Sequence, residues 1–381
     1  MKILRFMGYP ISKLGSLERY VHAQASEMGK QGHDVQIVYD GGGDSLAGAM
    51  AERTYPDVKV HYHFPSPAPR LSAVMDHLRY FFKALAFIRK GGFDIVHTYF
   101  EPSTQIVNLL APMLPGTVFV RTMGVVPRHP DNSTLIGKLK RLYHYLNLLN
   151  YDKVICVSEA VRDSLLMYKI KPELLSIIYN AVDTSLFKRY HIRPAHPDPF
   201  YLTFCGRLER IKNIECLING MSILTDKYKT KNVILNIYGE GSHTGFLRNL
   251  VVREKLEPYV HFKGLTHDIV RTLNEYTDIY VQASFSEGLP ASVLEAMACE
   301  LPVAVSRIGG HCTIVRHGIN GLLFDHHNPG NFAERVHQLV NSCGLRKELA
   351  ANARKTVLDS YDNSVSIRRE SNVYESLLNS R

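Results

Sequence analysis

Short runs of β-branched and other apolar residues alternate with amphipathic segments along the first half of this chain. The runs are KILRFM, DVQIVYD, VKVHYHF, DIVHTYF, TVFVRT, KVICVS and LSIIYNAV. Most of the stretches between them have apolar residues at helical spacing. Strands that are apolar on both faces and separated by helices indicate a doubly wound parallel sheet.

The same pattern starts again after a proline-rich break. Residues 188–200, KRYHIRPAHPDPF, contain three prolines and no periodicity, so we expect a linker there. The runs that follow it are YLTFCGRL, VILNIYGEG, VHFKGL, DIYVQAS, LPVAVSRI and GLLF. The second half therefore predicts a second α/β layer structure.

These patterns predict two Rossmann-like, doubly wound α/β domains and a final helix. A chain of 381 residues exceeds the usual size of one core. We expect an N-terminal domain over 1–190, a C-terminal domain over 191–360 and a helix over 361–381 that returns to the first domain. Ligands of open parallel sheets bind beyond the carboxyl ends of the strands, so two facing domains predict a deep cleft for two substrates.

The net positive charge is concentrated in the first half. Residues 1–190 carry 23 Lys and Arg against 16 Asp and Glu, whereas residues 191–381 carry 22 against 20. This half could meet an anionic partner such as phosphate, a lipid headgroup surface or nucleic acid, or simply expose a solvated basic face.

The remaining composition is that of an ordinary globular protein. The six cysteines form no C-x-x-C pair, and we expect reduced, buried thiols. The first residues contain too short an apolar stretch for a signal peptide, and no run of eighteen apolar residues occurs. We expect a cytoplasmic protein that can rest on a membrane.

The most informative segment is FSEGLPASVLEAMACELPVAVSRIGG, in which Glu287 and Glu295 are separated by seven residues. Pro290 suits the first turn of a helix over 291–299, which places Glu287 in the preceding loop and Glu295 inside the helix. Such a loop offers a carboxylate for hydroxyls and amides for an anion, the combination that a sugar phosphate requires. The alternative is that Glu295 only caps or pairs within the fold.

Two further segments follow strands of the second half. CGRLERIKN places Arg207 at a strand end and Lys212 where a helix begins, and two cations at that point could hold a diphosphate. In IYGEGSH, Gly239 and Gly241 follow a strand, where backbone could approach a ligand or merely turn. In the first half, Gly15 lies between a strand and a helix and could present amides to phosphate, although no G-x-G-x-x-G is present.

In combination these motifs resemble the donor domain of the family-four retaining glycosyltransferases of the GT-B fold. The resemblance covers residues 200–330, and residues 157–187 are similar to the end of that family's first domain. The residues that carry it are Gly206, Arg207, Lys212, Asn213, Gly239, Gly241, Glu287, Glu295, Gly309, Gly310 and Gly321 to Phe324.

The resemblance implies a glycosyltransferase that uses a nucleoside-diphosphate sugar as co-substrate and no other cofactor. Arg207 and Lys212 would neutralise the diphosphate, Glu287 would take the catalytic position near the reacting carbon, and Glu295 would hold the ribose. The amides of Gly288 and Leu289 would complete the donor pocket. No D-x-D occurs, which agrees with a metal-independent reaction in which cations stabilise the leaving group.

Departures from the family pattern concern mainly the first half. Met123 precedes Gly124 where relatives usually have a histidine that touches the donor sugar, and Thr313 replaces a usual glutamate. His97 and Arg121 remain as acceptor-side candidates. A lone strand histidine such as His97 is, however, more often a packed core residue.

Basic and aromatic residues are mixed in residues 70–90 and 138–146. Helices of this kind can lie in the headgroup region of a bilayer, so we hypothesise a peripheral membrane enzyme with a glycan or lipid-linked acceptor. In the alternative, the aromatics pack inward and only the charges are exposed. Two histidine pairs, His61 with His63 and His326 with His327, lack acidic or thiol partners nearby, and we expect no metal site.

Three other functions are compatible with these observations. A catalytically silent sugar-nucleotide binder would bind donor without transfer or hydrolysis. A nucleotide-sugar epimerase would isomerise the donor without an acceptor. A basic nucleic-acid-binding protein is disfavoured because no recognised motif is present.

Overall fold

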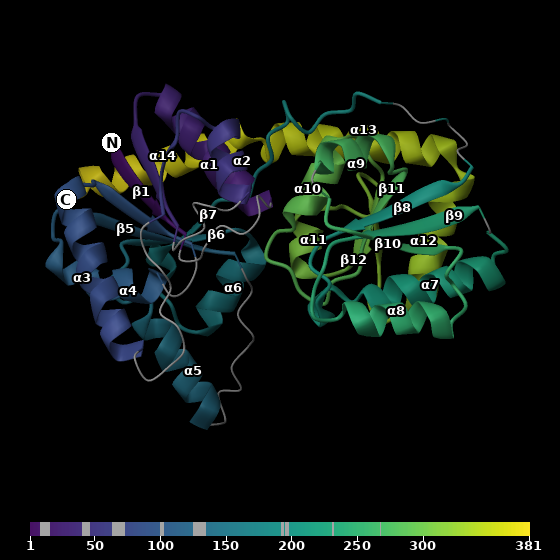
Figure 1. The fold of residues 1–381 in the computed structure, drawn as a ribbon, viewed down its shortest axis with the longest axis horizontal. Helices are drawn as coiled ribbons and strands as arrows, with labels where there is room; N and C mark the ends of the chain where they lie inside the picture. Colours follow the sequence, from purple (N-terminus) through teal and green to yellow (C-terminus); the bar gives the residue numbers. More distant parts are fainter. Residues whose placement is uncertain are drawn as a thin grey trace. The chain divides into compact units, whose positions relative to one another are not determined.

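The computed structural model describes residues 1–7, 16–39, 46–62, 73–99, 103–124, 135–191, 194, 198–230, 232–266 and 268–381 (Figure 1). The chain divides into two compact units. Unit 1 comprises Met1–Asn180 and Asn363–Arg381, and unit 2 comprises Ala181–Asp362.

The unit boundaries differ by a few residues from the ranges expected from sequence. Residues 181–190 pack with unit 2 because Arg354 donates hydrogen bonds to the carbonyls of Thr184 at 3.0 Å and Phe187 at 2.6 Å. The C-terminal segment forms helix α14 (Asn363–Asn379), which is part of unit 1.

Unit 1 is built on a seven-stranded parallel sheet with the strand order β3-β2-β1-β4-β5-β6-β7. The strands are β1 (Lys2–Phe6), β2 (Asp34–Val38), β3 (Lys59–His61), β4 (Ile95–Thr98), β5 (Val118–Met123), β6 (Lys153–Cys156) and β7 (Leu175–Ile177). Each coincides with one of the apolar runs of the sequence. The central strands β4 and β5 are buried along their whole length, as a sheet covered on both faces requires.

Helices cover both faces of this sheet. They are α1 (Ser16–Lys30), α2 (Leu46–Thr54), α3 (Ala73–Gly91), α4 (Ser103–Leu110), α5 (Leu135–Leu146) and α6 (Glu159–Met167), with the 3-10 turns η1 (Ala111–Met113) and η2 (Pro172–Leu174). Within unit 1, α1 and α14 pack side by side, and α3 and α4 pack against each other elsewhere (Figure 1).

Unit 2 repeats the architecture with a six-stranded parallel sheet in the order β10-β9-β8-β11-β12-β13. Its strands are β8 (Phe200–Cys205), β9 (Val233–Tyr238), β10 (Val260–Gly264), β11 (Ile279–Gln282), β12 (Val303–Ser306) and β13 (Leu322–Phe324). Its helices are α7 (Ile214–Asp226), α8 (Thr244–Arg253), α9 (Ile269–Glu275), α10 (Ala291–Ala298), α11 (Gly309–Ile314), α12 (Pro329–Asn341) and α13 (Cys343–Ser360), with the 3-10 turn η3 (Arg210–Lys212). The expected fold class, two parallel sheets flanked by helices, is confirmed.

The strand order of unit 2 reverses between β8 and β11, which are neighbours in the sheet. In open parallel sheets, ligands bind beyond the carboxyl ends of the strands at such a switch point. The segment after β8 contains Arg207 and Lys212, and the segment after β11 contains Glu287. The topology therefore brings the two motifs to one place.

A buried polar network fixes α14 to the sheet of unit 1. Arg5 on β1 has no exposed surface, and its guanidinium donates to Glu370 Oε1 at 2.7 Å and Gln24 Oε1 at 2.7 Å. Tyr374 also donates to Glu370, and its hydroxyl lies 2.6 Å from His97 Nδ1. Burial would raise the pKa of Glu370, but Arg5, His97 and Tyr374 together lower it to about 2.

All six cysteines are free, but the expectation that all are buried holds for only three of them. Cys312 is exposed, because it lies on the solvent side of the short helix α11, whereas Cys205 and Cys343 are half-buried and the other three are buried. None of the helices in the described ranges is long and apolar enough to cross a bilayer.

We predict that Glu370→Gln destabilises the protein by about 3–5 kcal/mol, because it leaves the Arg5 charge buried without its carboxylate. The matched control is Glu375→Gln, an exposed position on the same helix, which should change stability little. Urea unfolding of both variants measures the difference, and equal effects would contradict a structural role for the network.

The sign of the pH dependence follows from the lowered pKa of Glu370. This carboxylate contributes stability above the ordinary glutamate pKa, and the contribution is lost as the pH falls from there toward 2. The stability of Glu370→Gln should therefore lack that acid-sensitive component.

Candidate functional site

The candidate site lies at the carboxyl ends of the unit 2 strands, where segments after neighbouring strands are bonded to one another. The amide of Phe285, after β11, donates to the carbonyl of Ile211 at 2.9 Å. Asn213, which precedes α7 with a left-handed backbone (φ 49°), donates from its side chain to the carbonyl of His326 after β13, at 2.9 Å. The segments after β8, β11 and β13 thus form one connected surface.

Lys212 and Glu287 form an ion pair on this surface. The Lys212 Nζ lies 2.6 Å from Glu287 Oε1, and the two side chains are 18% and 14% exposed. The pair is thus largely shielded from water yet open at its edge, where a ligand could reach both charges.

The carboxylate of Glu287 is held through one of its two oxygens. Oε1 accepts hydrogen bonds from Lys212, from Ser284 Oγ at 2.6 Å and from Gln282 Nε2 at 2.7 Å. Among the residues that the structure describes, nothing is bonded to Oε2. Burial acts to raise the pKa of Glu287, but Lys212 and Ser284 outweigh it and the pKa is lowered. Glu287 is therefore an ionised acceptor with a free oxygen.

Arg207 is exposed and follows β8 by two residues. Its charge helps to lower the pKa of Glu209, for which the hydrogen bonds from Ser242 are the larger cause. Within the described ranges the guanidinium forms no hydrogen bond or ion pair. Arg207 is therefore a cation available to an anionic ligand.

The glycines of the motifs let backbone pack directly on backbone. A Cβ added to Gly239 would lie 1.8 Å from the carbonyl oxygen of Gly206, and one on Gly241 would lie 2.4 Å from that of Leu208. A Cβ on Gly310 would lie 2.5 Å from the carbonyl oxygen of Glu287. Side chains at Gly239 and Gly241 would push the segment after β9 away from the Arg207 segment, and one at Gly310 would push α11 away from the Glu287 segment.

His311 lies behind the ion pair and is fully buried. Its Nδ1 lies 2.8 Å from the carbonyl oxygen of Ser306, and Ser306 Oγ donates to the carbonyl of Ser284 at 2.8 Å. Burial lowers the pKa of His311 to about 4, although Glu287 acts to raise it. A neutral histidine thus supports the segment that contains Ser284 and Glu287.

The other donor-side candidates are placed as follows. Glu295 lies on α10, is only 4% exposed and interacts electrostatically with Tyr280 and Cys299. Gly288 and Leu289 are buried directly after Glu287. The amide of Gly288 donates no hydrogen bond to any other described residue. Gly15 lies outside the described residues.

The acceptor-side candidates of unit 1 are internal. His97 has no exposed surface, and its ring nitrogens lie 2.6 Å from Tyr374 Oη and 2.7 Å from Thr122 Oγ1. Arg121 is 7% exposed and lies 3.5 Å from the carbonyl oxygen of Asn147. Met123 is buried at the end of β5. This geometry favours the alternative of a packed core histidine at His97.

The described histidines of the two pairs lie among polar and aromatic neighbours. His61 bonds Gln36 at 2.9 Å, His63 lies outside the described residues, and His326 and His327 pack beside Phe285. In the parts of the chain that the structure describes, no three His, Cys, Asp or Glu side chains are grouped as metal ligands.

Three residues of the site escape prediction from the sequence: Gln282, Ser284 and His311. Gln282 and Ser284 are visible there only as polar residues at the end of an apolar strand, five and three residues before Glu287. The role of His311 depends on how α11 packs under Glu287, which no local pattern discloses.

Two family models match consecutive parts of the chain. "Glycosyltransferase Family 4" matches residues 17–186, and "Glycosyl transferases group 1" matches residues 188–356. Together they span both units, and the second contains Arg207, Lys212, Glu287 and Glu295.

Similar proteins share the whole length of the chain. An uncharacterized glycosyltransferase of Methanocaldococcus jannaschii, MJ1607, is 25% identical over an alignment 393 positions long, which covers 96% of each chain. Anabaena Alr3699/HepE in complex with UDP-glucose superposes with a TM-score of 0.82 at 19% identity, covering 99% of this chain and 100% of that one. A mutant of S. aureus TarM, in complex with fondaparinux, alpha-GlcNAc-glycerol and UDP, gives a TM-score of 0.74 at 18% identity over 98% of this chain and 100% of its own.

Motifs, topology and site geometry agree with these matches: the chain belongs to the family-four glycosyltransferases of the GT-B fold, and it transfers a sugar from a nucleotide sugar.

Proposed function

We propose that this glycosyltransferase transfers its sugar to a glycan acceptor with retention of the anomeric configuration and without a metal ion. The observation that carries the proposal is the Lys212–Glu287 pair at the switch point of unit 2. The segment after β8 that contains Lys212 also contains Arg207, which is unpaired within the described residues. The UDP and carbohydrate ligands named for the structural neighbours support a nucleoside-diphosphate sugar as donor and a glycan as acceptor.

Arg207 and Lys212 would stabilise the leaving diphosphate. Cleavage of the anomeric bond builds negative charge on the phosphate, and fixed cations at that point lower the barrier. Arg207 can hold phosphate oxygens with two parallel hydrogen bonds, whereas Lys212 supplies a point charge. The proposed reaction needs no metal because these two cations perform its electrostatic function.

Glu287 would accept a hydrogen bond from a hydroxyl of the donor sugar through its free Oε2. Three donors already surround Oε1, which weakens the carboxylate as a nucleophile but orients it as an acceptor. This arrangement supports attack by the acceptor from the face that the leaving group vacates, in preference to a covalent intermediate on Glu287. Retention follows from attack on that face.

The remaining donor contacts are carried over from the family resemblance. Glu295 would bond the ribose, Gly15 would present its amide to the phosphates, and Gly288 and Leu289 would complete the pocket with their amides. The Gly288 amide, which is unengaged within the described residues, is the best supported of these contacts. The Glu295 side chain is only 4% exposed, so the ribose would have to reach it through a narrow opening.

We also propose that the enzyme works at the inner face of an anionic membrane on a lipid-linked acceptor. On α3, Tyr80 is buried while Phe82 is 61% exposed, so the aromatics only partly pack inward. On α5, apolar side chains of the 138–146 segment are largely exposed, which favours an interfacial helix.

The direct test is a panel of uridine, guanosine and adenosine diphosphosugars, assayed for binding and for slow hydrolysis. We expect one base to bind and its sugar to be released with retained configuration in the presence of a metal chelator. Binding without hydrolysis or transfer would indicate a silent binder. Isomerised donor without acceptor would indicate an epimerase, and a chelator-sensitive rate would contradict the metal-independent mechanism.

We predict that Arg207→Ala and Lys212→Ala each reduce turnover about a hundred- to a thousandfold, the usual effect of removing one group that stabilises transition-state charge. Steady-state rates with the preferred donor measure the loss. Lys347→Ala, an exposed position on α13, is the control and should retain full activity. Unchanged rates for Arg207→Ala in a folded protein would refute the diphosphate site.

We predict that Gly310→Ala lowers turnover about a hundredfold, because its Cβ would displace the backbone of Glu287 and misplaced catalytic groups cost rates of this order. Gly344→Ala is the control, since nothing lies within 4 Å of a Cβ at that position. If both variants are equally active, the close packing of α11 on the Glu287 segment has no catalytic importance.

A further inference from the structure

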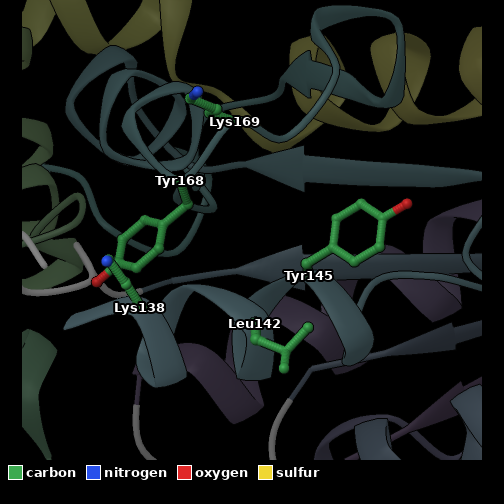
Figure 2. Close-up of a pocket in the computed structure, with 5 residues that line it drawn as sticks. All are labelled: Lys138, Leu142, Tyr145, Tyr168 and Lys169. Carbon is green, nitrogen blue, oxygen red and sulfur yellow. The ribbon is translucent and has the colours of Figure 1, made fainter. Parts of the chain in front are cut away.

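A pocket of about 550 Å³ lies in unit 1 between α5 and the end of α6 (Figure 2). Lys138, Leu142 and Tyr145 line it from α5, and Tyr168 and Lys169 line it from the end of α6. Tyr168 is only 2% exposed, so its ring forms a fixed part of the wall. Figure 2 shows the rings of Tyr145 and Tyr168 on opposite sides of the pocket.

The polar groups of this pocket suit an anion. Among the lining residues that the structure describes, Lys138 and Lys169 are basic and none is acidic. Both lysines are exposed, and neither forms an ion pair with another residue in the described ranges. In the view of Figure 2, the Lys138 ammonium lies on the Tyr168 side of the pocket and away from Tyr145.

The pocket adjoins an exposed apolar face of α5. Four residues at helical spacing form that face and are 44–56% exposed: Leu139, Leu142, Tyr143 and Leu146. Leu142 belongs to both the face and the pocket. Met167, next to Tyr168, is a further exposed apolar residue at 54%. Exposed apolar side chains gathered in this way mark an interaction site.

A cationic pocket beside an apolar helix face matches the two ends of an amphiphile. Helix α5 contains no acidic residue, as its sequence LIGKLKRLYHYL shows, and residues 1–190 contribute most of the net charge of +9. Such a helix can lie in the headgroup region with its apolar face toward the acyl chains, while lysines reach the phosphates. An acidic protein partner would satisfy the lysines but would leave the leucines without apolar contacts.

We propose that the pocket between α5 and α6 binds the phosphate headgroup of an anionic membrane lipid, with α5 seated in the bilayer interface. This inference rests on the proposed membrane association and gives it a specific site. Lys138 and Lys169 contact the phosphate, Tyr145 borders the headgroup, and Leu139, Leu142 and Leu146 contact the acyl chains. None of these residues is among those assigned to the donor.

Vesicle flotation of the full chain tests the proposal. We expect binding to phosphatidylcholine vesicles that contain phosphatidylglycerol and none to phosphatidylcholine alone. Lys138→Ala/Lys169→Ala should weaken binding by more than about tenfold, since each lysine at an anionic surface contributes roughly fivefold. Leu139→Ser/Leu142→Ser should weaken it as well, because the apolar contacts are lost.

The control is Lys347→Ala/Lys355→Ala, which removes the same charge from exposed positions on α13. Equal losses for both lysine pairs would show a nonspecific charge effect and overturn the proposal. So would unchanged binding of the pocket variant, or competition by soluble glycerol phosphate with no binding to vesicles. Hydrolysis of the soluble donor should be the same in all these variants, so failure of the lipid site and failure of the donor assignment give different results.

Discussion

The arrangement of the candidate donor site depends on close backbone contact between neighbouring segments at the carboxyl edge of one sheet. Gly239 packs on Gly206, Gly241 on Leu208, and Gly310 on Glu287, at distances that leave no space for a Cβ. These contacts fix the segments that carry Arg207 and Glu287 before any ligand arrives. Preorganised charges of this kind stabilise a transition state most effectively, because they need no rearrangement as the reaction proceeds.

The fold can be predicted from the sequence because each strand and helix is marked by a local pattern of apolar residues. Every expected strand in both units is present, since runs such as KVIC and LPVAV are buried on both faces of a parallel sheet and contain little that could face water. The two glutamates were also placed correctly, Glu287 in a loop and Glu295 within α10, because Pro290 marks the start of that helix. Chain order along the sheet then brings the Arg207 and Glu287 segments together.

The features that cannot be predicted from the sequence are those that depend on contacts between distant residues. Arg5 stands in an apolar strand, and nothing near it indicates that its partner is Glu370, which lies 365 positions later. The packing of the final helix on the sheet also explains His97. In the sequence this residue looks like a ligand-binding histidine, but in the structure it is hydrogen-bonded to Tyr374 of that helix. The exposure of Cys312 and the support from His311 likewise depend on the packing of α11.

Two ion pairs of the chain differ in how much of their side chains is exposed, and this difference decides whether a ligand can reach them. The Arg5 and Glu370 side chains are 0% and 3% exposed, so no ligand can reach them. This ion pair holds α14 against the sheet of unit 1. Lys212 and Glu287 are 18% and 14% exposed, which is enough for a phosphate to compete for the lysine. Under the proposed function, a phosphate that draws Lys212 away as the donor splits would leave Glu287 with more of its negative charge unshared. The carboxylate would then bond a sugar hydroxyl more strongly at the moment when the ring becomes positive. Under the proposed function, one ion pair thus couples stabilisation of the leaving group to stabilisation of the sugar.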